Sequence, residues 1–180
     1  MRKNILIFLI LIIPLINSFS QDNFQWMLDS KKSFIEYQAK HLLHKWIGTN
    51  NNVKGVFLLK EDDSRIAIAA NIADFDSGIS NRDSNALRVL EAFNHPQVKF
   101  YSDQILISKK KITLKGQLDF HGIKVNKNIE GSFLKDEKNI LIEGSFPIVL
   151  TDFKIELPSL MLKKIEDFAK ISYKLVFKRN

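Results

Sequence analysis

The sequence contains no cysteine in its 180 residues. This absence excludes a disulfide framework, a thiolate metal site, a cysteine nucleophile and a lipoprotein-type cysteine at a cleavage site. Because no covalent link can staple the chain, its stability must come from a hydrophobic core. Residues 21–180 are long enough to form such a core as one domain.

Signature motifs of catalysis are also missing. The chain has no Gly-x-Ser-x-Gly elbow, no His-Glu-x-x-His run and no glycine-rich phosphate loop. Four histidines and several aspartates and serines could still assemble a triad in space, so an envelope hydrolase acting on lipid esters stays open as an alternative. The sequence predicts a protein that is not an enzyme, with no catalytic residue and no cofactor.

Metal-ligand spacing is limited to one close pair, His41 and His44. Residues three apart share a helical face but point to opposite sides of a strand. No third ligand is near them in the sequence, so no metal site is predicted. Ligands that only the fold brings together leave no such pattern.

A long apolar run occurs only at the start of the chain. Arg2 and Lys3 precede an apolar stretch over residues 5–16, which is too short for a comfortable membrane span, and residues 18–20 offer small side chains for cleavage. We therefore predict a signal peptide over residues 1–20, and a periplasmic or secreted protein. An uncleaved N-terminal anchor is the alternative.

The charge excess is mild. Removing Arg2 and Lys3 from the 27 basic residues leaves 25 against 20 acidic ones, a net charge of +5 in place of +7. This excess favours transient contact with an anionic membrane surface. The lysines are scattered along the chain, so a nucleic-acid partner is not expected.

Two-residue alternation of apolar and polar side chains dominates the chain after Asn23 and favours strands. Residues 66–72, 112–120, 123–125, 129–133, 140–146 and 171–177 follow it, and further strands are expected near residues 33–39 and 53–60. Short connections such as residues 109–111 and 121–122 are typical of antiparallel hairpins. About eight strands of this kind predict an all-β fold, either two packed sheets or a closed barrel, and closure is favoured because it removes unpaired edges.

Whether the interior is filled or hollow stays open. The chain has 14 phenylalanines, many of them on the predicted inward face, and an eight-stranded barrel can either fill with side chains or hold one slender ligand. Gly55, Gly116, Gly131 and Gly144 also fall on the inward face. They indicate either spare room or points of curvature.

One helix interrupts the alternation after Ser80. Ser80 and Asp83 have the spacing of a capping box, and an apolar stripe over residues 86–93 is followed by Pro96, which ends helices. Arg82 opposes the helix dipole unless it is paired. Two roles are open for Arg82: an ion pair with one of the nearby aspartates, or binding of an anionic group at a ligand entrance.

The segment over residues 157–168 also breaks the alternation. Apolar residues follow Pro158 and Ser159. Two interpretations are equally open: a short apolar turn or helix that caps one end of the barrel, or a crossover packed on its outside.

Short segments in a particular order extend over most of the chain. They are Trp26–Asp29 with Ser33, His41, Val53–Phe57, Asp74–Gly78, Asn81–Asp83 with the helix that follows, Pro96–Phe100, Lys115–Ile123 and Asp152–Ile155. In this order and spacing the chain resembles the YceI-like family, the lipocalin-like polyisoprenoid-binding proteins of bacterial envelopes. The family often has a histidine where this chain has Asn85, and the approach to Pro96 is shortened here.

The resemblance implies an antiparallel lipocalin-like barrel whose apolar interior holds a long isoprenoid tail without catalysis. The predicted function is therefore binding, storage or transport of a polyisoprenoid or similar long-chain lipid, by a monomer or a homodimer. A barrel with a solid core that recruits a protein partner is a further alternative. The predicted ligand-binding residues are Phe57, Ile68, Ile72, Arg82, Phe100, Leu118, Phe120, Phe133, Phe146, Tyr173 and Phe177.

Overall fold

The computed structural model describes residues 25–42, 44–160 and 162–179. The predicted signal peptide, its cleavage site and the alternative N-terminal anchor lie outside the described residues. Among the residues that are described, no helix is both long enough and apolar enough to cross a membrane.

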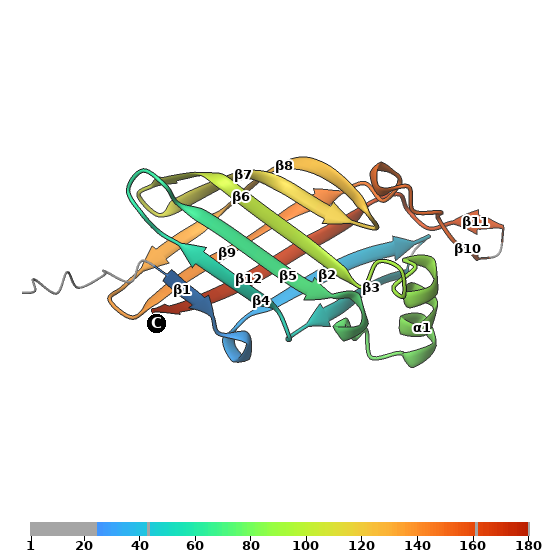
Figure 1. Cartoon of the computed structure of the whole chain (residues 1–180). Coiled ribbons are helices and arrows are strands. Elements are labelled where there is room, and N and C mark those ends of the chain that lie inside the picture. The colour runs from blue at the N-terminus through green and yellow to red at the C-terminus, as the bar shows by residue number, and fades with distance from the viewer. Residues whose placement is uncertain (1–24, 43, 161, 180) are drawn as a thin grey trace, which may run out of the picture.

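Eight antiparallel strands close into a barrel (Figure 1), because the last strand, β12, pairs with the first strand, β1. In the order of the ring the strands are β1 (Gln25–Leu28), β4 (Lys54–Leu58), β5 (Arg65–Asn71), β6 (Gln97–Ser108), β7 (Lys111–Phe120), β8 (Ile123–Lys135), β9 (Asn139–Ile148) and β12 (Ala169–Arg179). The predicted all-β barrel, with a short helix between middle strands, is confirmed.

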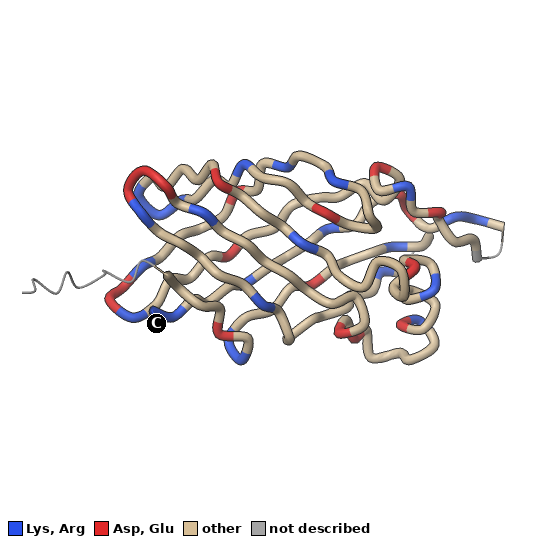
Figure 2. The backbone as a smooth tube through the Cα atoms, in the orientation of Figure 1, with Lys and Arg blue, Asp and Glu red and all other residues tan. Residues whose placement is uncertain are grey.

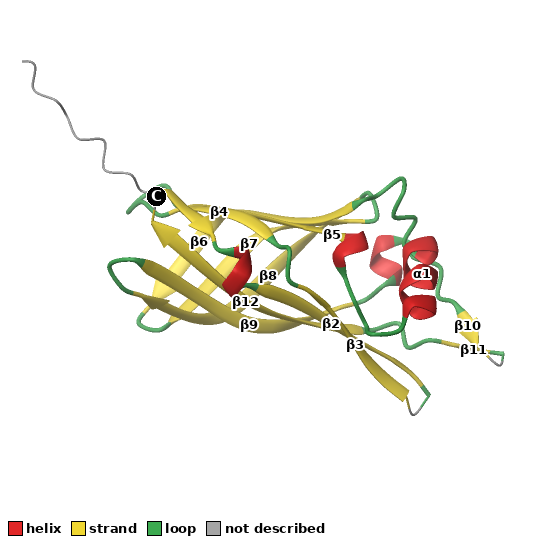
Figure 3. Ribbon diagram, turned by 90° about the horizontal axis from the view of Figure 1, so that it is seen from below, coloured by secondary structure: helices red, strands yellow, loops and turns green. Residues whose placement is uncertain are grey.

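A hairpin of β2 (Phe34–His41) and β3 (His44–Asn50) extends the wall at one end. Strand β2 continues along β12 beyond β1, and β3 pairs with β2. Strand β3 reaches the segment after β5 through a bridge between Thr49 and Asp76. Toward the hairpin tip, the described part of β3 forms no ladder with β5, so the wall is open there, beside α1 (Figure 3).

Helix α1 (Ser80–Val89) lies at this open end of the barrel and contains no buried residue. The predicted capping box is wrong. Ile79 occupies the N-cap position without a side-chain hydrogen bond, and Ser80 is already the first helical residue. Both carboxylate oxygens of Asp83 instead accept the backbone N–H of Ser77 at 3.2 Å, which places the negative charge at the positive helix end.

The helix is also shorter than the apolar stripe predicts. It ends at Val89, and Glu91 has a φ of 45°, so the chain turns away before the stripe is complete. The side chain of Phe93 is 98% exposed. The helical end therefore leaves one large apolar side chain in solvent.

Three short 3-10 helices complete the helical elements of the described chain. They are η1 (Ser30–Lys32), η2 (Ile72–Asp74) and η3 (Thr151–Phe153).

The segment over residues 157–168 forms a small hairpin of β10 (Ser159–Leu160) and β11 (Lys163–Lys164) that projects from the same end as α1 (Figure 1). It is not a helix. Hydrogen bonds join it to β2: the backbone N–H of Glu166 donates to the carbonyl of Lys40 at 3.0 Å, and Nε2 of His41 lies 3.1 Å from the carbonyl oxygen of Lys163.

The inward glycines make room for neighbouring protein atoms. A Cβ at Gly131 or at Gly144 would lie 2.7 or 2.5 Å from the hydroxyl of Tyr173, which occupies that space. A Cβ at Gly116 would lie 2.2 Å from the carbonyl oxygen of Tyr101, next to the register shift in β6. These positions are points of close packing, and their missing side chains do not form the cavity described below.

Candidate ligand cavity

An apolar cavity of about 840 Å³ occupies the half of the barrel nearest to α1. Its walls come from residues of β2, β3, β5, β6, β7, β8, β9 and β12, and from α1. The volume lies within the range of roughly 300–1,000 Å³ that is usual for small-molecule sites. The interior is therefore hollow over much of its length, contrary to the solid-core alternative.

Strand β12 shows where the hollow part ends. Its alternate residues Ala169, Ile171, Tyr173 and Leu175 line the cavity, whereas the next inward residue, Phe177, does not. The lined stretch from residue 169 to residue 175 measures about 20 Å along the strand, at roughly 3.3 Å per residue. A hollow lined over this length accommodates an extended, chain-like ligand.

The far half of the barrel is packed by its own side chains. Phe57 and Phe177 are fully buried and meet edge to face, with 5.8 Å between ring centroids. Ile66 on β5 and Ile112 on β7 continue the same inward rows but are buried in this packed half. Each row thus passes from cavity wall to solid core within one strand.

The predicted ligand-binding residues divide between these halves. Phe57, Phe133 and Phe177 are buried but do not line the cavity. The structure brings the other predicted residues together around it: Ile68, Ile72, Arg82, Phe100, Leu118, Phe120, Phe146 and Tyr173.

Several lining residues were not predicted from the sequence. Ala39 and Trp46 face each other across the β2–β3 ladder, and Leu87 and Leu90 come from the α1 segment. Alternation within residues 33–39 could have identified Ala39. The residues of α1 could not be found this way, because only the fold places the helix over the open end.

Two tyrosines supply polar atoms to the cavity wall. The hydroxyl of Tyr173 donates to the carbonyl of Glu130 at 3.0 Å, and burial raises the pKa of Tyr173 to about 12. Burial also raises the pKa of Tyr37, whose ring lies 5.7 Å from that of Phe75. Both hydroxyls therefore stay protonated at neutral pH, and the wall adds no negative charge at these positions.

Arg82 supplies a positive charge where α1 meets the cavity. Its guanidinium lies 5.3 Å from the centroid of the Trp46 ring, a cation–π contact. Among the ion pairs of the described residues, none involves Arg82, so the ion pair with a nearby aspartate is not formed. The guanidinium keeps its capacity to hydrogen-bond an anionic or polar group.

The cavity opens at the end that carries α1 and the two hairpin tips. Exposed residues of this end, including His44, Asn81, Asn85 and Arg88, contribute to its lining. The β2–β3 tip, the β10–β11 hairpin and α1 all lie at this end of the molecule (Figure 3). We refer to it below as the mouth.

Exposed apolar side chains cluster in the elements around the mouth. Leu162 in the β10–β11 turn is fully exposed, as is Phe93 after α1, and Leu42 in the β2–β3 turn is also exposed. Lys163 and Lys164 follow Leu162 directly, and Figure 2 shows this basic stretch on the projecting hairpin. The mouth therefore combines apolar tips with positive charge.

A family model described as a YceI-like domain matches residues 26–177. No curated protein matches the sequence.

Solved structures share the fold at low sequence identity. BcnA from Burkholderia cenocepacia has a TM-score of 0.75 at 17% identity, with 83% of this chain and 98% of that chain covered. A polyisoprenoid binding domain from Saccharophagus degradans, implicated in plant cell wall breakdown, has a TM-score of 0.72 at 12% identity over 86% of this chain and 98% of that one. The YCEI protein of Campylobacter jejuni has a TM-score of 0.65 at 17% identity over 78% and 90% of the two chains.

Proposed function

Because the chain belongs to the YceI-like family, we propose that it binds a polyisoprenoid or a similar long apolar lipid and does not alter it chemically. The observation that carries this proposal is the deep apolar cavity of about 840 Å³, which is open at one end and closed by packed phenylalanines at the other. The polyisoprenoid-binding domain with the same fold supports the choice of lipid.

Burial of a hydrocarbon chain supplies enough free energy for this role. Each methylene removed from water contributes about 0.8 kcal/mol. About four isoprene units, of roughly five carbons each, would contribute on the order of 16 kcal/mol against an association cost of about 4–15 kcal/mol. Burial of the hydrocarbon tail alone therefore gives useful affinity. The affinity depends more on the length of the tail than on the polar head group.

The ligand enters tail first in this proposal. Apolar side chains line the cavity from the mouth inward to Leu175. Arg82, in contact with the Trp46 ring, lies where α1 lines the cavity. A polar or anionic head left near the mouth would accept hydrogen bonds from the Arg82 guanidinium. Phe57 and Phe177 form the floor beneath the tail, so the ligand stops short of them.

The site of action that we propose is the cell envelope. The apolar start of the sequence has the pattern of a signal peptide, and a protein that carries long lipids has to exchange them with a membrane. We propose that the mouth contacts the membrane surface during exchange, with Phe93 and Leu162 in the apolar layer and Lys163 and Lys164 near anionic head groups.

The test of lipid binding is a comparison of two alanines on one strand. Ala70 points into the cavity, whereas Ala69 is its outward-facing neighbour on β5. Protein with Ala70→Trp should lose the lipid that co-purifies with the wild type, because the indole fills the cavity, and Ala69→Trp should retain it. Mass spectrometry of solvent extracts measures both.

Equal lipid content in the two folded variants, or no lipid in the wild type even after incubation with polyisoprenyl phosphate, would contradict the proposal. Appearance of hydrolysis products from added polyprenyl or acyl esters would instead favour the hydrolase alternative.

A further inference from the structure

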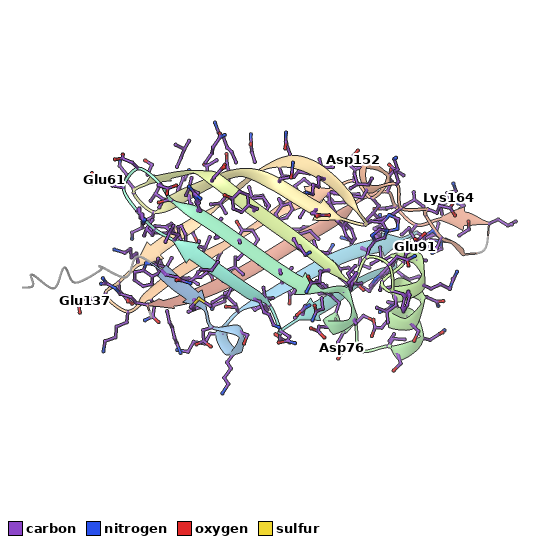
Figure 4. The ribbon with its side chains drawn as sticks, viewed as in Figure 1. Glu61, Asp76, Glu91, Glu137, Asp152 and Lys164 are labelled. Atoms are coloured by element: carbon purple, nitrogen blue, oxygen red, sulfur yellow. The ribbon has the colours of Figure 1, made fainter. Side chains whose placement is uncertain are left out.

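Two histidines and a glutamate from distant parts of the sequence meet at the cavity end of the barrel. Glu91 and His95 belong to the turn that follows α1, and His121 belongs to the tight turn between β7 and β8. One ligand atom of each residue lies within 4.8 Å of those of the other two. Figure 4 labels Glu91 at the end of α1, beside the barrel.

His121 is held in the orientation of a metal ligand. Its Nδ1 lies 2.9 Å from the carbonyl oxygen of Phe153, so Nδ1 carries the proton and donates it. The lone pair is then on Nε2, which is buried and has no hydrogen-bond partner among the described residues. Metal-binding histidines typically donate their other ring N–H to a carbonyl in this way, and a buried unpaired nitrogen is costly unless a ligand satisfies it.

His95 packs against His121. The two imidazole rings have their centroids 4.9 Å apart at an interplanar angle of 57°. Gly122, with a φ of 72°, lies beneath the ring, and a Cβ there would come within 2.7 Å of Cε1 of His95. The glycine therefore serves both the β7–β8 turn and the close approach of the two histidines.

Glu91 is brought to the pair by the backbone after the helix. Its carbonyl accepts the N–H groups of both Asn94 and His95 at 2.9 Å, which closes a turn that places residues 91 and 95 on one side. The side-chain amide of Asn94 lies 3.5 Å from Oε2 of Glu91, so the other carboxylate oxygen keeps its capacity as a ligand.

We propose that Glu91, His95 and His121 bind a divalent transition metal, with Zn²⁺ the best match. Two imidazoles and one carboxylate form a three-residue zinc set that leaves a fourth position for water. At metal–ligand distances of roughly 2.0–2.2 Å, the ligand atoms of a tetrahedral site lie about 3.3 Å apart, so the cluster must close by about 1–1.5 Å. Rotation of the exposed Glu91 side chain and a small shift of the His95 turn provide this.

The metal would tie the end of α1 to the barrel wall. Because α1 contains no buried residue and lines the mouth, its position depends on a few half-buried contacts. Ligation of Glu91 and His95 to His121 fixes its C-terminal end against the β7–β8 turn. Mg²⁺ and Ca²⁺ prefer oxygen ligands and do not suit this site.

The test uses the untagged chain and ZnCl₂. Isothermal titration should give one Zn²⁺ per chain, and thermal unfolding should shift upward with Zn²⁺ but not with Mg²⁺ at the same concentration. Glu91→Gln, His95→Asn and His121→Asn should each weaken binding at least tenfold and abolish the thermal shift. Asparagine is chosen at position 121 because it tolerates the φ of 52° found there.

The matched control is His44→Asn, which alters an exposed histidine of the β2–β3 hairpin outside the cluster. It should bind Zn²⁺ like the wild type. Absence of binding to the wild type at micromolar Zn²⁺ would overturn the proposal. Zn²⁺ binding by the folded His95→Asn and Glu91→Gln variants that equals binding by the wild type would overturn it too. So would a loss of Zn²⁺ binding in His44→Asn as large as the loss in the cluster variants. The lipid content of the protein plays no part in these outcomes.

Discussion

At the scale of single residues, Tyr173 shows how one side chain connects packing with the cavity. Its ring forms part of the cavity wall, while its hydroxyl lies over two glycines and donates to the carbonyl of Glu130. Gly131 and Gly144 are paired across β8 and β9, so the phenol fits only because both lack a side chain. From the sequence, the glycines were ambiguous between spare room and curvature, since the residue that fills the space lies on a third strand.

The burial of Tyr173 predicts a pH dependence of stability. Its pKa is about 12 in the folded protein against 10.0 for an unperturbed tyrosine, so the folded state binds this proton more tightly. The contribution of Tyr173 to the free energy of unfolding should therefore be constant below about pH 10. It should fall as the pH rises from there toward 12. Urea unfolding at pH 9 and pH 11 measures the fall, which should be smaller in Tyr173→Phe.

Absorbance at 295 nm gives the matching titration. One of the three tyrosines should ionise near pH 12, and this step should be missing in Tyr173→Phe. If the variant keeps that step, or if its stability falls as steeply as that of the wild type, the assignment is wrong.

At the scale of elements, strands were far more predictable than the helix and the hairpin. The alternation of β5 and β7 follows directly from one buried face and one more exposed face. The predictions of a capping box and of a helix along the full apolar stripe were wrong. Helix α1 lies over an opening and has no buried residue, so burial against a core does not determine where it begins and ends. The exposure of Phe93 depends on the turn at Glu91, which no sequence spacing indicates.

The exposed tips of these elements predict membrane binding. Phe93→Ser and Leu162→Ser should each weaken binding to vesicles of anionic phospholipid by about tenfold or more, because burial of such a side chain is worth roughly 1.5–3 kcal/mol. Sedimentation with vesicles measures this binding. Leu106→Ser is the control, because Leu106 is an exposed leucine near the end of β6, far along that strand from the mouth.

Membrane binding by the mouth would be contradicted by equal losses in all three variants. It would also be contradicted by wild-type binding that does not weaken when anionic vesicles are replaced by neutral ones, since Lys163 and Lys164 should each contribute about 1 kcal/mol near an anionic surface.

At the scale of the whole molecule, the barrel is divided into a packed half and a hollow half. The sequence predicted closure and the inward rows, because both depend on alternation along single strands. It could not predict the boundary between the halves. Phe57 and Phe177 come from the two strands that flank β1 and pack against each other, whereas Phe100 and Phe120, which look alike in the sequence, line a cavity. That difference depends on contacts between strands far apart in the chain.

The two tryptophans of the chain test this division directly, since Trp46 lines the cavity and Trp26 is buried in the packed half. The measurement is quenching of tryptophan fluorescence by a long-chain lipid brominated along its tail, in single-tryptophan variants. Trp26→Phe, which retains Trp46, should be quenched on binding, and Trp46→Phe, which retains Trp26, should be quenched little. Equal quenching of both tryptophans, or none of Trp46 at saturating lipid, would contradict a tail bound in the hollow half.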